Sequence, residues 1–193
     1  MSTSRDQIMQ RVRDALSPLP TRAPLPAWDR DLVHMHDTVT PTELWPLFAE
    51  RLTSVNGEPC EDLTALVAIL RENQWTHGYC DPALWPEVAV AFTDDYTVGI
   101  TAATGAIAET GTLILGNLTT SSRLAALAPW AHIAVVRSDQ QYPDIPAAIT
   151  ALPDEPNLIW VTGPPKTADV EGILIEGVHG PGRQFALRLD RRT

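Results

Sequence analysis

Three short segments in the second half of the chain carry the side chains that could do chemistry. The first is Ala108-Glu109-Thr110-Gly111-Thr112, in which a lone acid lies between a stretch of small residues and an apolar run. Partial burial makes a carboxylate a stronger nucleophile and base. A structural acid that accepts backbone hydrogen bonds at a turn has the same pattern. Glu109 is therefore a candidate catalytic residue, and the structural role stays open beside it.

The second segment is a candidate anion site. Thr120, Ser121 and Ser122 precede Arg123, where a helix over 121–128 is expected to begin. Hydroxyls, unpaired amides and a guanidinium at a helix start bind anions, and the same residue types also make an ordinary N-cap.

The third segment has the densest set of functional side chains. Lys166, Thr167 and Asp169 lie within 162–171, and His179 follows within 177–182. Lys166 would neutralise a carboxylate or phosphate, and Asp169 would orient a neighbouring side chain. His179 would donate or accept a proton, unless it is a structural residue of the turn. A phosphate-binding P-loop is excluded because Trp160 and Pro165 stand where that motif needs glycine, and no dinucleotide-binding GxGxxG follows a strand.

Charge and composition exclude several classes of protein. The chain has 193 residues, with 14 Lys and Arg against 24 Asp and Glu and a net charge of -10. That sign disfavours nucleic acid and anionic membrane surfaces as partners. No apolar run has the length of a membrane span and the N-terminus does not resemble a signal or transit peptide, so we expect a cytoplasmic location.

The only two cysteines, Cys60 and Cys80, lack the spacing of a redox pair or a zinc site. An iron-sulfur cluster typically takes four thiolates, so we expect this chain to hold no cluster of its own. His34 and His36 lack an evident third ligand, and no metal site is expected.

The pattern of apolar residues predicts two regions. Residues 1–27 comprise an amphipathic helix that ends near Ser17 and a proline-rich arm, and residues 28–193 form a single α/β domain.

Helices and strands are predicted to alternate along the second region. Helices are expected from about Thr40 to Ser54, over 63–72, over 121–128 and over 145–152. Strands are expected over 88–92, 98–102, 112–115, 133–136, 158–161 and 185–189 and at Ile107. Their alternation predicts a three-layer α/β/α fold with a mostly parallel sheet. Ligands of such sheets bind beyond the carboxyl ends of the strands, so we expect the three segments to converge there.

Five elements of the sequence match a family signature in order. They are residues 108–112, Ser122-Arg123-Leu124, residues 132–136, Gly163-Pro164 with Lys166-Thr167-Ala168-Asp169-Val170-Glu171, and residues 177–181. The chain thereby resembles the lactate utilization protein C family (LutC, DUF162), from which it departs at Pro165 and Lys166, where that family usually has Ser and Arg. The resemblance implies a fold like that of sugar-phosphate isomerases and coenzyme A transferases. It also implies a role in oxidising L-lactate to pyruvate beside iron-sulfur partner proteins.

Three hypotheses follow. The first is a cluster-free component of a lactate-oxidising assembly, acting with iron-sulfur subunits and holding a small anion in a cleft. The second is a stand-alone transferase or isomerase that uses Glu109, which rests on fold analogy. The third is a purely structural subunit of the assembly, so the residues leave open whether the chain is an enzyme.

Overall fold

The computed structural model describes residues 3–18, 44–85, 97–117, 123–152, 155, 157–167 and 174–190. The chain divides into two compact units, Met1–His36 and Asp37–Thr193. The predicted boundary after residue 27 and the predicted proline arm beyond Pro18 lie outside the described residues.

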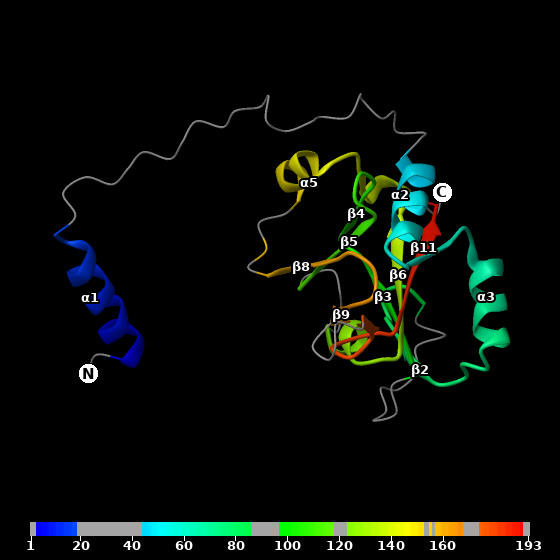
Figure 1. Cartoon of the computed structure of the whole chain (residues 1–193), viewed down its shortest axis with the longest axis horizontal. Coiled ribbons are helices and arrows are strands. Elements are labelled where there is room, and N and C mark those ends of the chain that lie inside the picture. The colour runs from blue at the N-terminus through cyan, green and yellow to red at the C-terminus, as the bar shows by residue number, and fades with distance from the viewer. Residues whose placement is uncertain are drawn as a thin grey trace. The chain divides into compact units, whose positions relative to one another are not determined.

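The first unit contains the predicted amphipathic helix, α1 (Ser4–Leu16), which is blue in Figure 1. Thr3 and Asp6 form a capping box at its start, because the Thr3 hydroxyl accepts from the Asp6 amide and the Asp6 carboxylate accepts from the Thr3 amide. No residue of α1 is buried, so its apolar stripe, which includes Ile8 and Val12, faces solvent within this unit.

Two helices open the described part of the second unit. α2 (Leu44–Ser54) buries one face that includes Phe48 and Leu52. The cap predicted at Thr40 lies outside the described residues. α3 (Leu63–Glu72) begins as predicted, because the Asp62 carboxylate accepts a 2.8 Å hydrogen bond from the Ala65 amide and caps the first turn.

The central sheet has five strands in the order β1-β11-β6-β3-β2, and every neighbouring pair is parallel. The strands are β1 (Glu58–Cys60), β2 (Gly78–Cys80), β3 (Val98–Ala102), β6 (Ala131–Arg137) and β11 (Arg183–Leu189). The three inner strands, β3, β6 and β11, confirm the predicted apolar runs. The two outer strands, β1 and β2, were not predicted.

A second sheet has four strands in the order β7-β4-β5-β8. Its members are β4 (Gly105–Ile107), β5 (Thr112–Gly116), β7 (Gln141–Tyr142) and β8 (Leu158–Val161), and the β4–β5 and β5–β8 pairs are antiparallel. The 3₁₀ turn η3 (Ser138–Gln140) precedes β7, and a small hairpin joins β9 (Lys166–Thr167) to β10 (Ile175–Glu176). The strand predicted over 88–92 lies outside the described residues.

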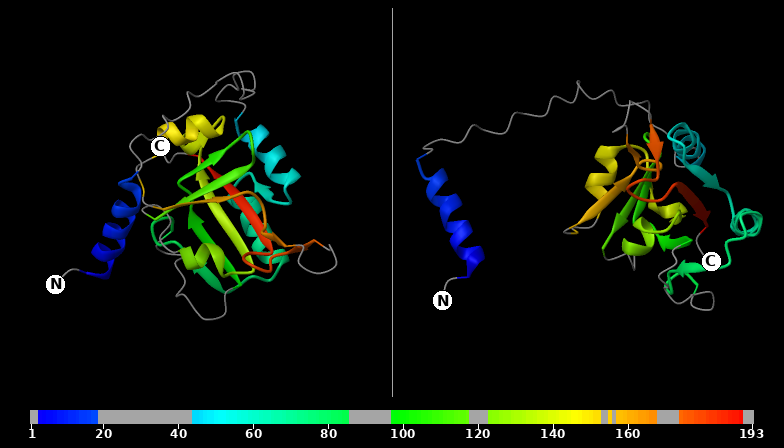
Figure 2. Two further views of the ribbon diagram at one scale, coloured as in Figure 1. Left: turned by 60° about the vertical axis from the view of Figure 1, so that its left-hand side comes forward. Right: turned by 60° about the horizontal axis from the view of Figure 1, so that its bottom comes forward.

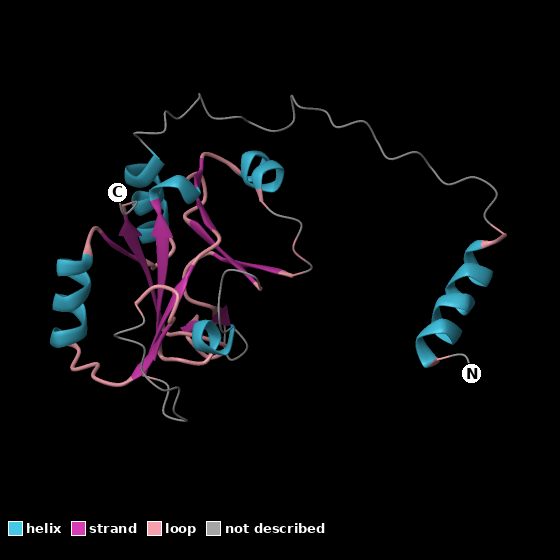
Figure 3. Cartoon of the chain, turned by 180° about the vertical axis from the view of Figure 1, so that it is seen from behind, coloured by secondary structure: helices cyan, strands magenta, loops and turns pink. Residues whose placement is uncertain are grey.

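Helices cover both sides of the strands. α3 contacts β1 and β11 on one face of the central sheet, where Leu66, Ile133 and Phe185 share a core (Figure 1). α2, α4 (Arg123–Leu127) and the second sheet lie on the opposite face, and α5 (Ile145–Ala151) covers the far side of β4 (Figures 2 and 3). This confirms the predicted α/β/α class with a mostly parallel central sheet, to which the second sheet adds an antiparallel part. None of the helices in the described ranges is long and apolar enough to cross a membrane.

Arg183 joins three elements at the amino end of the central sheet. Its guanidinium donates to both carboxylate oxygens of Glu58 in β1, at 2.7 and 2.6 Å, and to the side-chain oxygen of Asn73 at the end of α3. The same group lies 4.7 Å from the ring centre of Phe185. The planar fork of arginine suits this two-pronged pairing, which ties β11, β1 and α3 together.

The link between β3 and β4 contains the buried hydroxyl of Thr104. Thr104 is 6% exposed, and its Oγ1 has no partner in the part of the chain that the structure describes. Because valine has the same shape without the hydroxyl, we expect Thr104→Val to raise the free energy of unfolding by about 1 kcal/mol. Urea denaturation measures this change in the free energy of unfolding. Thr112→Val is the matched control, since the Thr112 hydroxyl has two partners and its loss should destabilise the fold. Equal effects of the two substitutions would contradict the expectation.

Candidate functional site

A pocket of about 390 Å³ opens in the second unit beside the amino end of β11. Its wall comes from the end of α4, the end of β8, the loop 162–165 and the turn 179–181. Polar groups reach it from Thr162, Lys166, His179 and Gln184. The volume falls at the lower end of the range for small-molecule sites.

Two glycine-dependent turns shape this pocket. Gly163 has a φ of 72° and lies against the backbone oxygen of Val55, which directly follows α2. Gly177 has a φ of 76° and packs on Gly182. Glycine adopts such left-handed conformations at no steric cost, because it has no Cβ. The two turns therefore let the 162–166 and 177–182 segments approach closely.

The two segments are joined by direct contacts. The Gly177 amide donates to the Pro165 carbonyl oxygen at 2.9 Å, and the Pro165 ring lies 3.1 Å from where a Cβ on Gly180 would be. Lys166 follows Pro165 and His179 precedes Gly180, so both side chains lie along the pocket wall. This packing brings together two residues that are 13 positions apart in the sequence.

The Lys166 ammonium is held by an acid on the neighbouring strand. Its Nζ lies 3.5 Å from Oε1 of Glu176, which also accepts a hydrogen bond from the Asn56 side-chain amide. Both partners of the ion pair are about one-third exposed, so the pair is worth little to stability. An ammonium has three donor hydrogens, so Lys166 can bind a ligand oxygen while it keeps Glu176.

A buried polar network supports the floor of the pocket. His132 on β6 is fully buried, with Nδ1 3.0 Å from Oε1 of Gln184 and Nε2 2.9 Å from the Thr101 hydroxyl. The Gln184 amide nitrogen donates to the carbonyl oxygens of His132 and Phe185, so Oε1 must be the atom that accepts from His132. His132 therefore carries its proton on Nδ1 and accepts from Thr101 at Nε2. Burial lowers the pKa of His132 to about 4, which keeps the ring neutral at pH 7.

A chain of three hydroxyl groups reaches the pocket from the β4–β5 turn. The Oγ1 atoms of Thr110 and Thr112 are 2.7 Å apart, and those of Thr112 and Thr162 are 2.8 Å apart. The chain exists because β5 and β8 are antiparallel, with Leu113 paired to Val161, which makes Thr112 and Thr162 neighbours. It links the turn that carries Glu109 to the pocket wall.

The structure brings only some of the predicted site residues to this pocket. Lys166 and His179 line it, whereas Glu109, Arg123 and Thr167 are not among the described residues of the lining. Glu109 lies in the β4–β5 turn, where its amide donates to the Pro143 carbonyl oxygen, and Arg123 opens α4. Thr167 follows Lys166 in β9. Thr120, Ser121, Ser122 and Asp169 lie outside the described residues.

The pocket also differs in position from the expectation. Gln184 is the second residue of β11 and α4 leads into the start of β6, so the pocket lies at the amino ends of these parallel strands. The rule of binding beyond the carboxyl ends applies to open, doubly wound sheets. Here the second sheet lies against the central one, and the carboxyl end of β8 supplies the opposing wall.

The sequence analysis did not name Thr162, Gln184 or His132 as site residues, although residues 162 and 132 lie in segments that it selected. Gln184 and His132 interrupt otherwise apolar strands, and an isolated buried polar residue needs a hydrogen-bond partner, which is the signal that could have found them. Thr162 directly follows an apolar strand, and its pairing with Thr112 depends on an antiparallel register that the local sequence does not encode.

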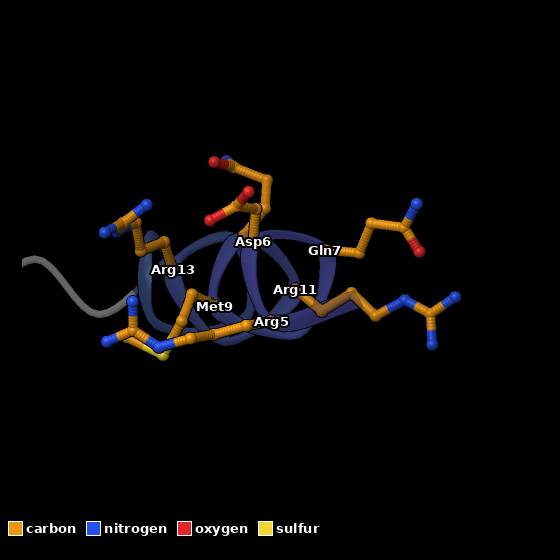
Figure 4. Close-up of a pocket in the computed structure, with 7 residues that line it drawn as sticks. Arg5, Asp6, Gln7, Met9, Arg11 and Arg13 are labelled. Atoms are coloured by element: carbon orange, nitrogen blue, oxygen red, sulfur yellow. The ribbon is translucent and has the colours of Figure 1, made fainter. Parts of the chain in front are cut away.

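Helix α1 presents a second hollow, drawn in Figure 4, between side chains that include Arg5, Met9 and Arg13. Every contributing residue belongs to this one helix and is exposed. Side chains that point away from a single helix cannot enclose a ligand, so the hollow is not a binding site. Within the described ranges, no cluster of three or more His, Cys, Asp and Glu side chains is placed to hold a metal ion.

The fold and the pocket together define an α/β protein with a pocket beside a mostly parallel sheet. The chain belongs to the LUD domain family, whose pattern its residues 91–187 match.

Two curated relatives are named lactate utilization protein C. The lactate utilization protein C of Deinococcus radiodurans is 32% identical over 140 residues, which cover 70% of this chain and 60% of the relative. The lactate utilization protein C of a Geobacillus species is 29% identical over 136 residues, which cover 64% of this chain and 56% of the relative. This chain thus spans little more than half the length of these relatives. The crystal structure of a DUF162 family protein from Deinococcus radiodurans has a TM-score of 0.55 at 22% identity and covers 78% of this chain and 99% of that chain. That likeness shows the shared fold.

Proposed function

We propose that this protein is a component of L-lactate utilization that acts in the oxidation of L-lactate to pyruvate. The observation that carries the proposal is membership of the LUD domain family together with relatives named lactate utilization protein C. The pocket agrees with it, because Lys166 and His179 offer a cation and a hydrogen-bonding ring to a small carboxylate.

The proposal includes partners that carry the redox chemistry, as iron-sulfur proteins. The two cysteines support this division of labour. Cys60 ends β1 and Cys80 ends β2, which form opposite edges of the five-stranded sheet, four strand spacings and roughly 19 Å apart. Both thiols are buried, and burial raises the pKa of Cys60. Two thiols at this separation cannot share a cluster.

Growth of a mutant strain tests the proposed role. In Deinococcus radiodurans deleted for its lactate utilization protein C, we expect expression of this chain to restore growth on L-lactate. Lys166→Met should restore growth less well, because the carboxylate loses its cation, while Thr104→Val should act as the unaltered chain does. Growth on a sugar is the control for general fitness. Failure of the accumulated, folded chain to restore growth on lactate would count against the proposal.

A further inference from the structure

The pocket is larger than lactate requires. Its volume of about 390 Å³ has room for roughly a dozen water-sized atoms, at ~30 Å³ each. Lactate has six non-hydrogen atoms and would leave about half of that space to water. A ligand that fills the pocket needs about twice as many atoms.

The lining shows what the additional atoms should be. Among the described residues of the lining, Leu127, the ring of Trp160 and the three prolines Pro164, Pro165 and Pro181 present apolar surface. The charged or hydrogen-bonding groups there come from Thr162, Lys166, His179, Gln184 and the indole N–H of Trp160. The amide of Gln184 is already committed to His132 and to backbone oxygens. An apolar body with a compact polar end matches this division.

The chain of three threonine hydroxyls determines which polar groups of a ligand Thr162 can bind. Each of the three threonine hydroxyls can donate or accept, so the chain can run in either direction. When it runs from Thr110 to Thr162, the Thr162 hydrogen is available to a ligand oxygen. When it runs the other way, Thr162 offers a lone pair to a ligand hydroxyl. Thr110 is half-buried, so solvent can serve the other end in both cases.

We propose that this pocket binds 2-hydroxy carboxylates with an apolar side chain of about seven carbons, together with their 2-oxo counterparts. Lys166 binds the carboxylate, and Thr162, backed by Thr112 and Thr110, binds the 2-oxygen in either oxidation state. The choice of a 2-hydroxy acid rests on the proposed function, whereas the size and the apolar body rest on the pocket. Thr162 is a specificity-determining residue for the 2-oxygen.

Calorimetric titration of the full chain tests the ligand class with three probes. These are L-lactate, L-3-phenyllactate, which has twelve non-hydrogen atoms, and 3-phenylpropionate, which lacks the 2-hydroxyl. We expect 3-phenyllactate to bind at least about tenfold more tightly than lactate, because its ring buries apolar surface. We expect it to bind about fivefold more tightly than 3-phenylpropionate, because of the hydrogen bond to Thr162. Lactate binding as tightly as 3-phenyllactate, or no binding of any probe, would overturn the proposal.

Four substitutions test the residues. Thr162→Val should lower the affinity for 3-phenyllactate to that for 3-phenylpropionate and leave the latter unchanged. Thr112→Val should cause a smaller loss of the same kind, and Lys166→Met should weaken both probes together. Thr104→Val, a buried threonine outside the hydroxyl chain, is the matched control and should change neither. Thr162 is exposed, so Thr162→Val is expected to fold, and thermal unfolding verifies this. A preference for the hydroxy acid that survives in folded Thr162→Val would overturn the role of Thr162.

The outcomes separate this inference from the proposed function. A chain that restores growth on lactate but does not prefer 3-phenyllactate refutes only the ligand class inferred here. A chain that binds 3-phenyllactate as described but does not restore growth refutes only the role in lactate utilization.

Discussion

Substitution of Gly111 by alanine is expected to lower the free energy of unfolding by about 2 to 5 kcal/mol. Gly111 has a φ of 65°, in the left-handed region, where a side chain costs roughly 1–2 kcal/mol. Its Cβ would also approach the backbone at the end of α2, with the Leu52 nitrogen nearest and the carbonyl carbon of Arg51 at 2.6 Å. Backbone cannot rotate away as a side chain can, so overpacking adds roughly 1–3 kcal/mol.

Urea denaturation of three variants separates the two contributions. Gly111→Asn should recover part of the loss, because asparagine tolerates the left-handed conformation, while the clash with α2 remains. Gly180→Ala is the matched control, since the atom nearest to its Cβ would be in the Pro165 ring at 3.1 Å, and it should cost less than about 1 kcal/mol. Comparable losses in Gly111→Ala and Gly180→Ala would show that contact with α2 does not constrain this turn.

Gly111 also shows what the Glu109-Thr110-Gly111-Thr112 element does in the fold. Its glycine permits the turn to pack on α2, and its two threonines begin the hydroxyl chain that ends at Thr162. The sequence drew attention to Glu109, the ionisable residue. The structural account of this element instead depends on the residues around the acid.

Elements with strong periodicity or a recognisable cap were predictable from the sequence. Asp62 begins α3, Asp144 begins α5 through a 2.7 Å bond to the Ala147 amide, and the apolar runs of β3 and β8 match the observed strands residue for residue. The outer strands β1 and β2 were not predictable, because each has three residues and they contain Pro59 and Gly78. Such segments lack both length and β propensity, and pairing with β11 and β3 makes them strands.

The candidate site was also predictable only in part, because residue types can be recognised in the local sequence and strand pairing cannot. Lys166 and His179 stand out by residue type. Between them the antiparallel strands β9 and β10 bring the chain back, so both residues line the pocket. The second sheet could not be predicted, because an apolar run does not reveal whether its partner is parallel or antiparallel. That pairing places Thr162 beside Thr112 and moves the pocket to the amino ends of β6 and β11.

The network around His132 has a consequence for stability against pH. Burial lowers the pKa of His132 from its ordinary 6.5 to about 4 in the folded protein. Below pH 6.5 the unfolded chain therefore binds a proton that the folded chain does not, so stability falls as the pH falls from about 6.5 to about 4. Below pH 4 both states are protonated and this loss stops growing. The shift corresponds to about 3 kcal/mol lost by pH 4.

Comparison with His132→Gln isolates this contribution from that of the carboxylates. Urea denaturation at pH 7, 6, 5 and 4 should show stability falling by about 3 kcal/mol more in the unaltered chain than in His132→Gln, because the variant has no group to protonate at that position. The variant should be less stable at pH 7, since glutamine cannot reproduce both contacts of the ring with Thr101 and Gln184. His77→Gln, which alters an exposed histidine, should keep the full dependence on pH. Parallel curves for the unaltered chain and His132→Gln would mean that His132 is protonated in the folded state at a pH well above 4, and that the buried network accommodates a cation.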